Sequence, residues 1–389
     1  MSRINSNYLK NMVISMNSDM LLSESKNLKN GVDSELTLQM SENNYTLERV
    51  AELSQMLKNK VDSAIHEIGK LNAQTQMIAI NARIEASRAG LAGKTFSVVA
   101  EQMNELSNKI GVVNKKMRIE SRDALNELEN LIRVQATNVR GTRLSDLALT
   151  NIDIIDRNLF ERSVDVSWWA ADDGVVNALT RKTKGSYDLV EKRFSIILNS
   201  YAVYFDLVLC DLDGNIVANG MPENTCSVGM NVKNSEWFDS AMRTTNGKEF
   251  GFQKVSRNTL VNNEVSLVFS CAVREGGYQH GKIIGVLGAF FRWEDLVQKI
   301  VKQAHLIDEE KHSTRICIVD DDGLIFADSK DLILDDKIEF LGRNMLFEKK
   351  KDFMIADYRG DKCCIAHAYS PGYETYASGL HSLIIQKIA

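Results

Sequence analysis

An acidic and a basic residue, Glu85 and Arg88, stand three positions apart in a segment rich in helix-forming residues. At that spacing the two side chains lie one helical turn apart, so they can pair with each other or across a contact with another helix. Apolar and amide side chains precede them in the sequence: Met77, Ile80, Asn81 and Ile84. This combination suits the recognition of another protein surface, and the alternative is an ordinary solvent-facing ion pair on a helical hairpin.

Residues that could carry catalysis or hold a metal are scattered. The six histidines have no metal-ligand spacing, and no nucleophile elbow, phosphate loop or pair of catalytic acids is visible. The six cysteines show no zinc spacing and are expected to be reduced thiols. The neighbours Cys363 and Cys364 are expected to be strand residues that face opposite ways, with a redox pair as the alternative. We therefore expect no enzyme, no cofactor and no metal site.

The elements that position Glu85 and Arg88 are two helices joined by a tight turn. Gly90 and Gly93 bracket Leu91 and Ala92, and glycine can end a helix in the left-handed conformation without a steric penalty. Apolar and small residues recur at spacings of three and four on both sides of the turn, which predicts an antiparallel coiled-coil hairpin. The predicted seam consists of Val61, Ala64, Ile68, Leu71, Thr75, Ile78 and Ala82, then Phe96, Val99, Met103, Leu106, Ile110, Val113 and Met117. Such a hairpin has little core, so we expect it to self-associate.

Residues 74–110 resemble the tip of bacterial methyl-accepting chemotaxis receptors. The matching positions are Gln74, Thr75, Ala79, Asn81, Ala82, Glu85, Ala86, Arg88, Ala89, Gly90, Gly93, Phe96, Val98, Val99, Ala100, Glu101 and Leu106. The resemblance implies a homodimer, association of three dimers at the tip, and docking of the histidine kinase CheA and its coupling protein CheW. It implies a partner-binding surface made of Met77, Ile80, Asn81, Ile84, Glu85, Arg88, Leu91 and Val98.

Several positions depart from the pattern of that family, among them Ala73, which stands where several members carry an aromatic residue. Leu91 stands where the family usually has an acidic residue, Thr95 replaces a glycine and Arg83 replaces a small alanine. Thr95 restricts the backbone near the turn, and the loss of the acid removes a hydrogen-bonding group. Coupling to the kinase is therefore the part of the implied function that most needs a test.

Composition limits the class of protein. The chain has 389 residues, a net charge of -5 and 25% charged residues, which is enough for two or three domains and does not suggest nucleic-acid binding. No segment approaches the roughly 20 apolar residues needed to cross a bilayer, so we expect no membrane span and a cytoplasmic location. Both prolines, Pro222 and Pro371, lie in the C-terminal half, which permits long helices before them.

The organisation along the chain follows from these patterns. We expect a polar helical lead over residues 1–32, a signalling hairpin over 33–140 with its tip near 90–93, and connecting helices over 141–204, with Gly141 as a break or hinge. Of the adjacent Trp168 and Trp169, one is expected to pack on the following domain and the other to lie at an edge, because they cannot face the same way. A ligand or subunit contact is the alternative role for this pair.

From Phe205 onward the apolar period changes to two, which predicts strands. The segment LVLCDLDGNIVANG is echoed later by RICIVDDDGLIFADS, so the sequence contains a partial repeat with an acidic turn between two strands. The order of elements resembles the double Cache sensor domain of bacterial receptors, with units over 205–300 and 301–389. The expected fold is therefore α+β: a long antiparallel helical hairpin followed by a PAS-like double Cache domain.

The resemblance to Cache domains implies a small-molecule site in the first unit. Candidate ligand-binding residues are Trp237, Phe250, Phe252, Gln253, Phe269 and Ser270, and core packing is the alternative for the phenylalanines. Family members that bind amino acids carry an Arg and an Asp where this chain has Ser235 and Phe290, so a free α-amino acid is disfavoured. We expect a receptor that senses a small ligand and controls CheA. The alternative is a Cache ligand-binding protein whose hairpin serves only for oligomerisation or scaffolding.

Overall fold

The computed structural model describes residues 49–223 and 226–388. The chain divides between Asn138 and Val139 into two compact units, a helical one and one that contains two β-sheets. The predicted polar lead over residues 1–32 and the first part of the predicted hairpin, residues 33–48, lie outside the described residues.

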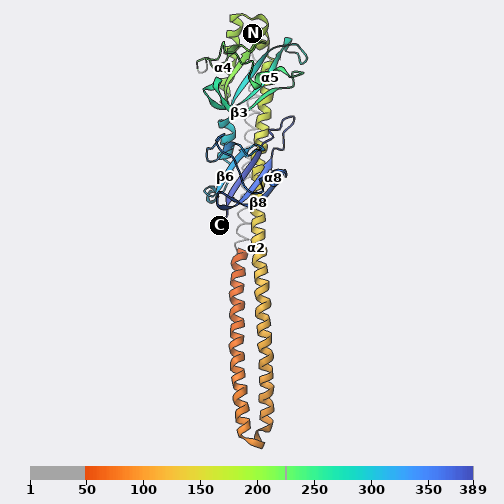
Figure 1. The fold of residues 1–389 in the computed structure, drawn as a ribbon, viewed down its shortest axis with the longest axis vertical. Coiled ribbons are helices and arrows are strands. Elements are labelled where there is room, and N and C mark those ends of the chain that lie inside the picture. The colour runs from red at the N-terminus through yellow and green to blue at the C-terminus, as the bar shows by residue number, and fades with distance from the viewer. Residues whose placement is uncertain (1–48, 224–225, 389) are drawn as a thin grey trace, which may run out of the picture. The chain divides into compact units, whose positions relative to one another are not determined.

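The first unit is the predicted helical hairpin (Figure 1). Residues 49–88 are helical, the 3-10 turn η1 spans Gly90–Gly93, and helix α2 spans Lys94–Ala170, of which residues 94–138 belong to this unit. Gly90 has a φ of 61°, which favours glycine. A Cβ on Gly93 would lie 2.1 Å from the carbonyl oxygen of Ala86, so only glycine fits where the chain reverses.

The two helices of the hairpin touch through small and polar residues. Ala79, Ala86, Ala100 and Ser107 are buried between them, together with Ile65. A Cβ on Gly69 would meet the Asn114 amide at 3.3 Å, and one on Gly111 would meet the Asn72 amide at the same distance. Small side chains at these positions let the helices approach closely.

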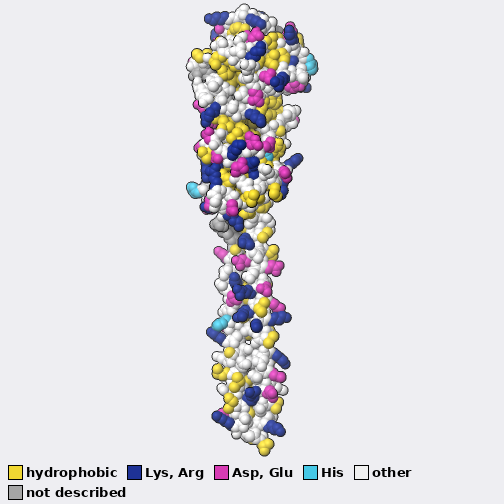
Figure 2. All heavy atoms as spheres, in the orientation of Figure 1, with side chains coloured by type: hydrophobic (Ala, Val, Ile, Leu, Met, Phe, Trp, Pro, Cys, Tyr) yellow, Lys and Arg dark blue, Asp and Glu magenta, His cyan; other side chains and the backbone are white. Residues whose placement is uncertain are grey.

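The predicted seam is therefore only partly correct. Val61, Thr75, Ala82, Met103, Ile110 and Met117 are half-buried, whereas Ala64, Ile68, Leu71, Ile78, Phe96, Val99, Leu106 and Val113 are exposed. Figure 2 shows hydrophobic side chains on the surface of the hairpin down to its turn. None of the predicted seam residues is fully buried, and within a single chain much of the apolar stripe does not face the other helix.

The second unit begins within α2 and continues into a first five-stranded antiparallel sheet, of order β2-β1-β5-β4-β3. Its elements are α3 Asp173–Arg181, α4 Lys184–Ser200, β1 Tyr204–Cys210, β2 Ile216–Asn219, α5 Glu236–Met242, β3 Gly251–Asn258, η2 Thr259–Val261, β4 Glu264–Arg274, η3 Glu275–Gly277 and β5 Ile283–Arg292. Helix α5 covers one face of this sheet through Trp237 and Phe238, and α2, α3 and α4 cover the other.

A second sheet repeats the same topology, with the order β7-β6-β10-β9-β8 (Figure 1). Its elements are η4 Glu294–Gln298, α6 Lys299–Lys302, α7 Asp308–Lys311, β6 Thr314–Val319, β7 Ile325–Asp328, α8 Arg343–Phe347, β8 Lys351–Tyr358, β9 Asp361–Tyr369 and β10 His381–Lys387. Cys363 and Cys364 lie on opposite faces of β9, in separate apolar clusters, as predicted for strand residues.

The predicted repeat is confirmed at the level of single hydrogen bonds. The Oδ1 atom of Asp211 accepts hydrogen bonds from two backbone amides of the following turn, and Asp320 does the same in the second sheet. On the two strands that flank each turn, equivalent side chains form a hydrogen bond. Asn219 donates to Asp206 at 2.8 Å in the first sheet, and Arg315 donates to Asp328 at 2.7 Å in the second. Each sheet thus has a polar side-chain pair between its first two strands at the equivalent position, but the charges of the two pairs differ.

Helix α2 extends beyond the break that was predicted at Gly141. Gly141 is inside the helix, and a Cβ there would lie 2.2 Å from the ring of Phe353. The glycine is needed for a close approach to β8 rather than for a hinge. Further along, Leu144, Ile152, Ile155, Leu159 and Val166 are buried in the core that α2 shares with both sheets.

The two adjacent tryptophans face different ways, as predicted. Trp169 packs edge-on against Tyr201 and Tyr204, with ring centroids 6.1 and 5.4 Å away, whereas Trp168 is 74% exposed.

Candidate functional site

The turn of the hairpin presents a charged pair. The Nη1 atom of Arg88 donates to Oε1 of Glu85 at 2.7 Å, and both side chains are largely exposed. An exposed pair of this kind contributes little to stability. Either side chain can therefore leave the other and pair with a group on another molecule.

Apolar side chains surround this pair on the surface. Met77, Ile80, Ile84, Leu91 and Val98 are all exposed, and Leu91 at the turn is 93% exposed. Asn81 is also exposed, so in a single chain it does not lie between the two helices. All eight residues predicted to bind partners are thus accessible, and the structure does not test whether they do so.

Polar contacts between the helices behind the turn were not predicted from the sequence. Ser107 donates to the side-chain oxygen of Asn72 at 2.8 Å, and Asn114 donates to the carbonyl of Ile65 at 3.2 Å. These bonds fix the register of the hairpin, since a buried polar group needs its partner. The signal in the sequence is the pairing of Gly69 with Asn114 and of Gly111 with Asn72 across the turn.

The predicted ligand-binding residues divide between the two faces of the first sheet. Trp237 is buried beneath α5, and a Cβ on Gly288 would lie 2.7 Å from its ring, so the indole fills the space over the centre of the sheet. Ser270 donates to the carbonyl of Trp237 at 2.6 Å. Gln253 and Trp237 both line a groove of about 400 Å³ beside the start of α5.

The phenylalanines of the predicted set belong to the core on the α2 side. The rings of Phe250 and Phe269 are 5.6 Å apart, and Phe252 packs on Phe269 at 5.9 Å. Tyr376, from the loop between β9 and β10, packs on Phe269 at 5.9 Å. These aromatic rings connect the first sheet to a loop of the second. A ligand-binding role for this set stays a prediction.

The fold brings together two histidines that belong to no apparent sequence motif. The Nε2 atom of His367 on β9 lies 2.7 Å from Nδ1 of His381 on β10, and Nε2 of His381 lies 2.8 Å from Oδ1 of the exposed Asp321. Phe347 stacks on His381 with ring centroids 4.1 Å apart. Burial, and then the neighbouring His381, lower the pKa of His367 to about 3. Burial also lowers the pKa of His381, against the opposing effect of Asp321.

These histidines do not form a metal centre in the described part of the chain, where no group of three or more His, Cys, Asp or Glu side chains is placed to hold an ion. Within residues 49–223 and 226–388, no helix combines the length and the apolar character that crossing a membrane requires.

Comparison with known proteins finds different relatives for the two parts of the chain. Residues 23–153 match the family model of the methyl-accepting chemotaxis protein (MCP) signalling domain. Methyl-accepting chemotaxis protein McpB of Bacillus subtilis is 33% identical over 97 residues, which are 24% of this chain and 13% of that protein. Methyl-accepting chemotaxis protein IV of Escherichia coli is 32% identical over 120 residues, which are 30% of this chain and 20% of that protein. The chain thus spans a fifth or less of the length of these two relatives.

The second unit is similar to a solved sensory domain. The sensory domain of the Campylobacter jejuni chemoreceptor Tlp3 (CcmL) aligns with a TM-score of 0.50 and 14% identity, over 64% of this chain and 94% of that one. At this identity the likeness shows the fold alone. Residues 23–153 thus carry an MCP signalling domain, and the part of the chain that follows has the paired-sheet fold of that chemoreceptor's sensory domain.

Proposed function

We propose that this chain is a chemotaxis-type receptor that senses a small ligand through its second unit and controls the kinase CheA, together with CheW, through the turn of its hairpin. The observation that carries the proposal is the exposed Glu85–Arg88 pair amid exposed apolar side chains, inside a segment that matches the MCP signalling domain. A charged pair set in an apolar surface offers both affinity and orientation to a protein partner.

The hairpin is proposed to work as a homodimer, with association of dimers at the tip. Exposed Leu71, Ile78, Leu106 and Val113 form apolar surface that a single hairpin leaves in water. A second hairpin would bury these side chains in a four-helix bundle, at about 25 cal/mol per Å² of apolar area. Sedimentation of the whole chain should show a dimer, and a monomer at micromolar concentration would contradict this.

Helix α2 connects the two proposed activities, ligand sensing and control of the kinase. Residues 94–138 of this helix belong to the hairpin, and residues 144–170 pack in the core of the sensory unit. A ligand that prefers one packing of the helix would shift the hairpin between kinase-active and kinase-inactive arrangements, by as much as its affinities for the two differ. Because CheA and CheW are the proposed partners, we place the hairpin in the cytoplasm.

A pull-down tests the docking surface. The whole chain should retain purified CheA and CheW, and Arg88→Trp should abolish retention because the bulky ring replaces the guanidinium at the contact. The matched control is Arg122→Trp, which makes the same change at an exposed position of α2 away from the turn. Retention that is equally strong in all three proteins would reject docking at the turn.

The second candidate is a ligand-binding protein whose hairpin only oligomerises. It is favoured by Leu91, which is 93% exposed at a position where related receptors usually carry an acid. In that case the chain would form dimers in sedimentation but would retain neither CheA nor CheW.

A further inference from the structure

A buried arginine at the end of β4 has no acidic partner in the described part of the chain. Arg274 is 7% exposed, and its guanidinium donates to the carbonyls of Gly281 at 3.0 Å and Thr244 at 2.8 Å, and to the hydroxyl of Thr244 at 3.2 Å. All three acceptors are neutral. Among the described residues, none of the hydrogen bonds of this guanidinium goes to a carboxylate. Its Nε atom is shielded from solvent and has no hydrogen-bond partner among the described residues.

Such an arrangement is costly unless something supplies the opposite charge. A guanidinium has five N–H donors, and the contacts of Arg274 use three of them. Buried charges in proteins are normally paired, because removal from water is not compensated by neutral acceptors alone. The side chain is therefore poised to receive an anion.

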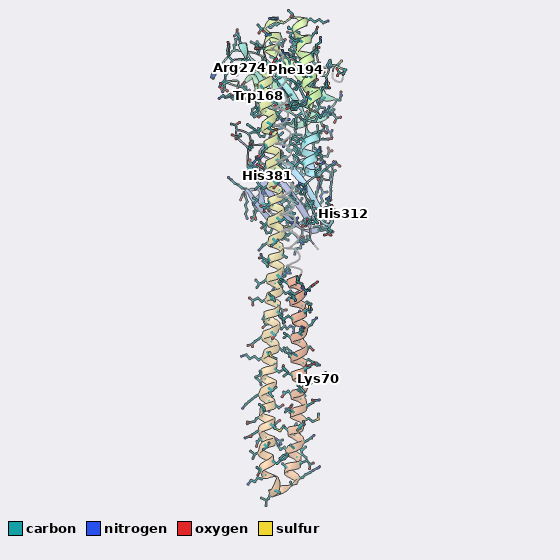
Figure 3. The ribbon with its side chains drawn as sticks, turned by 180° about the vertical axis from the view of Figure 1, so that it is seen from behind. Lys70, Trp168, Phe194, Arg274, His312 and His381 are labelled. Atoms are coloured by element: carbon teal, nitrogen blue, oxygen red, sulfur yellow. The ribbon has the colours of Figure 1, made fainter. Side chains whose placement is uncertain are left out.

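Arg274 lines a groove that an anion could enter. The groove has a volume of about 690 Å³ and runs between the C-terminal part of α2, the loop before β3 and the loop after β4. Its walls are largely apolar and aromatic: Phe160, Val164, Trp168, Ala171, Phe250 and Tyr278. We call it the α2 groove. Figure 3 shows Trp168 and Arg274 on the same side of the second unit. The volume lies within the range of small-molecule sites, roughly 300–1,000 Å³.

The remaining charges leave the α2 groove positive. Lys248 lines it and is exposed. Glu249 is the one acidic residue among its described lining residues, and its carboxylate is already engaged by the amide and hydroxyl of Thr245 at 2.6 and 2.7 Å and by Asn246 at 2.9 Å. Ser163, Ser167 and Gln279 add neutral hydrogen-bonding groups to the lining.

We propose that the α2 groove binds a small carboxylate with an aromatic or branched apolar body. The carboxylate pairs with Arg274 at the floor, and the apolar body lies against Trp168 and Phe160. This site is distinct from the one predicted from the sequence, because of that set only Phe250 lines the groove. A ligand here would touch α2 directly. The inference names a ligand class for the proposed sensory unit. It rests on the proposed receptor function only where a bound ligand is to change the activity of the kinase.

Calorimetry on the whole chain tests the site without any kinase. The probes are phenylacetate, benzoate and 4-methylpentanoate, with phenylacetamide and acetate as matched compounds that lack the charge or the apolar body. At least one of the three carboxylates should bind, and the neutral amide and acetate should bind at least tenfold more weakly. Binding of acetate as tight as that of phenylacetate, or no binding by any of the three, would overturn the proposal.

Variants locate the binding. Arg274→Gln and Trp168→Ala should each weaken binding at least tenfold. The matched controls are Arg243→Gln and Ile196→Ala, which change exposed residues elsewhere in the same unit and should leave binding unchanged. Because Trp168 is exposed, its variant tests the site even if Arg274→Gln fails to fold. Binding that survives Trp168→Ala undiminished would refute the assignment.

The two proposals can fail separately. Carboxylate binding without any effect on CheA would contradict the receptor function and leave the α2 groove as a ligand site. Control of CheA by another ligand in a protein that binds none of these carboxylates would contradict the site alone.

Discussion

His367 is fully buried, and its surroundings determine when it accepts a proton. Its Nδ1 atom has no partner among the described residues, and Nε2 contacts His381. Burial and the neighbouring histidine lower its pKa to about 3, whereas an unfolded chain would hold this group near pKa 6.5. Between about pH 6.5 and pH 3 the unfolded state therefore binds a proton that the folded state does not. Stability from this residue is present above pH 6.5 and is lost as the pH falls through that window.

We predict that His367→Gln makes the melting temperature less dependent on pH. In the parent chain the melting temperature should fall between pH 7.5 and pH 5, and the glutamine variant should show a clearly smaller fall because its side chain does not titrate. His312→Gln, at an exposed histidine, is the control and should retain the parent's pH dependence. Thermal unfolding at the two pH values is the measurement. Identical falls in all three proteins would show that His367 is not the responsible group.

The histidine pair and the α2 groove could not be predicted from the sequence. His367 and His381 meet because β9 and β10 pair in one register, in which His367 lies opposite Leu383 and diagonal to His381. Arg274 stands out only in the folded chain, because its hydrogen bonds to neutral acceptors alone, among the described residues, are contacts made after folding. By contrast, the turn glycines were predictable, because left-handed backbone and close approach demand glycine itself.

Helix α2 is the element that connects the parts of the second unit. Asp156 on this helix is buried and accepts hydrogen bonds from the hydroxyl of Ser370 at 2.6 Å, the amide of Gly372 at 2.8 Å and the amide of Ser378 at 3.1 Å. These three donors belong to the loop between β9 and β10, which also carries Tyr376 to the aromatic cluster of the first sheet. One carboxylate thus holds the helix to a loop that touches both sheets.

We predict that Asp156→Ala destabilises the second unit by about 2–4 kcal/mol, because three donors lose their acceptor and part of that loss is an unsatisfied buried group. The control is Asp146→Ala on the same helix, where the carboxylate is exposed and pairs with Lys351 at 2.5 Å. Exposed pairs contribute little, so this variant should unfold like the parent. Urea unfolding followed by tryptophan fluorescence measures both. Equal midpoints for the two variants would contradict the role of Asp156.

For whole helices and strands, the sequence predicted the type of each major element better than its first and last residues and its contacts. The change of period at Phe205 and the repeated acidic turn were sufficient to predict two similar sheets, because strand alternation and turn chemistry are local. Gly141 was wrongly interpreted as a break, since the demand for glycine there comes from Phe353, some 200 residues later. The apolar stripes of the hairpin were visible, but sequence periodicity does not tell whether a stripe faces the other arm or another molecule.

For the whole molecule, the central claim is that a sensory unit and a kinase-docking hairpin act through one continuous helix. The claim requires that the α2 residues packed against the sheets and the α2 residues of the hairpin respond together to a ligand. Of the departures at Arg83, Leu91 and Thr95, Leu91 belongs to the proposed docking surface, and the other two lie near it in the sequence. The kinase step is therefore the one on which the account most depends.

The most direct measurement is CheA autophosphorylation with CheW and the whole chain in a reconstituted assembly. The account predicts that the parent chain changes the rate severalfold relative to CheA and CheW alone, and that Arg88→Trp returns it to the level without receptor. The control Arg122→Trp should behave as the parent. A parent chain that leaves the rate unchanged, or an Arg88→Trp chain that changes it as the parent does, would contradict the account.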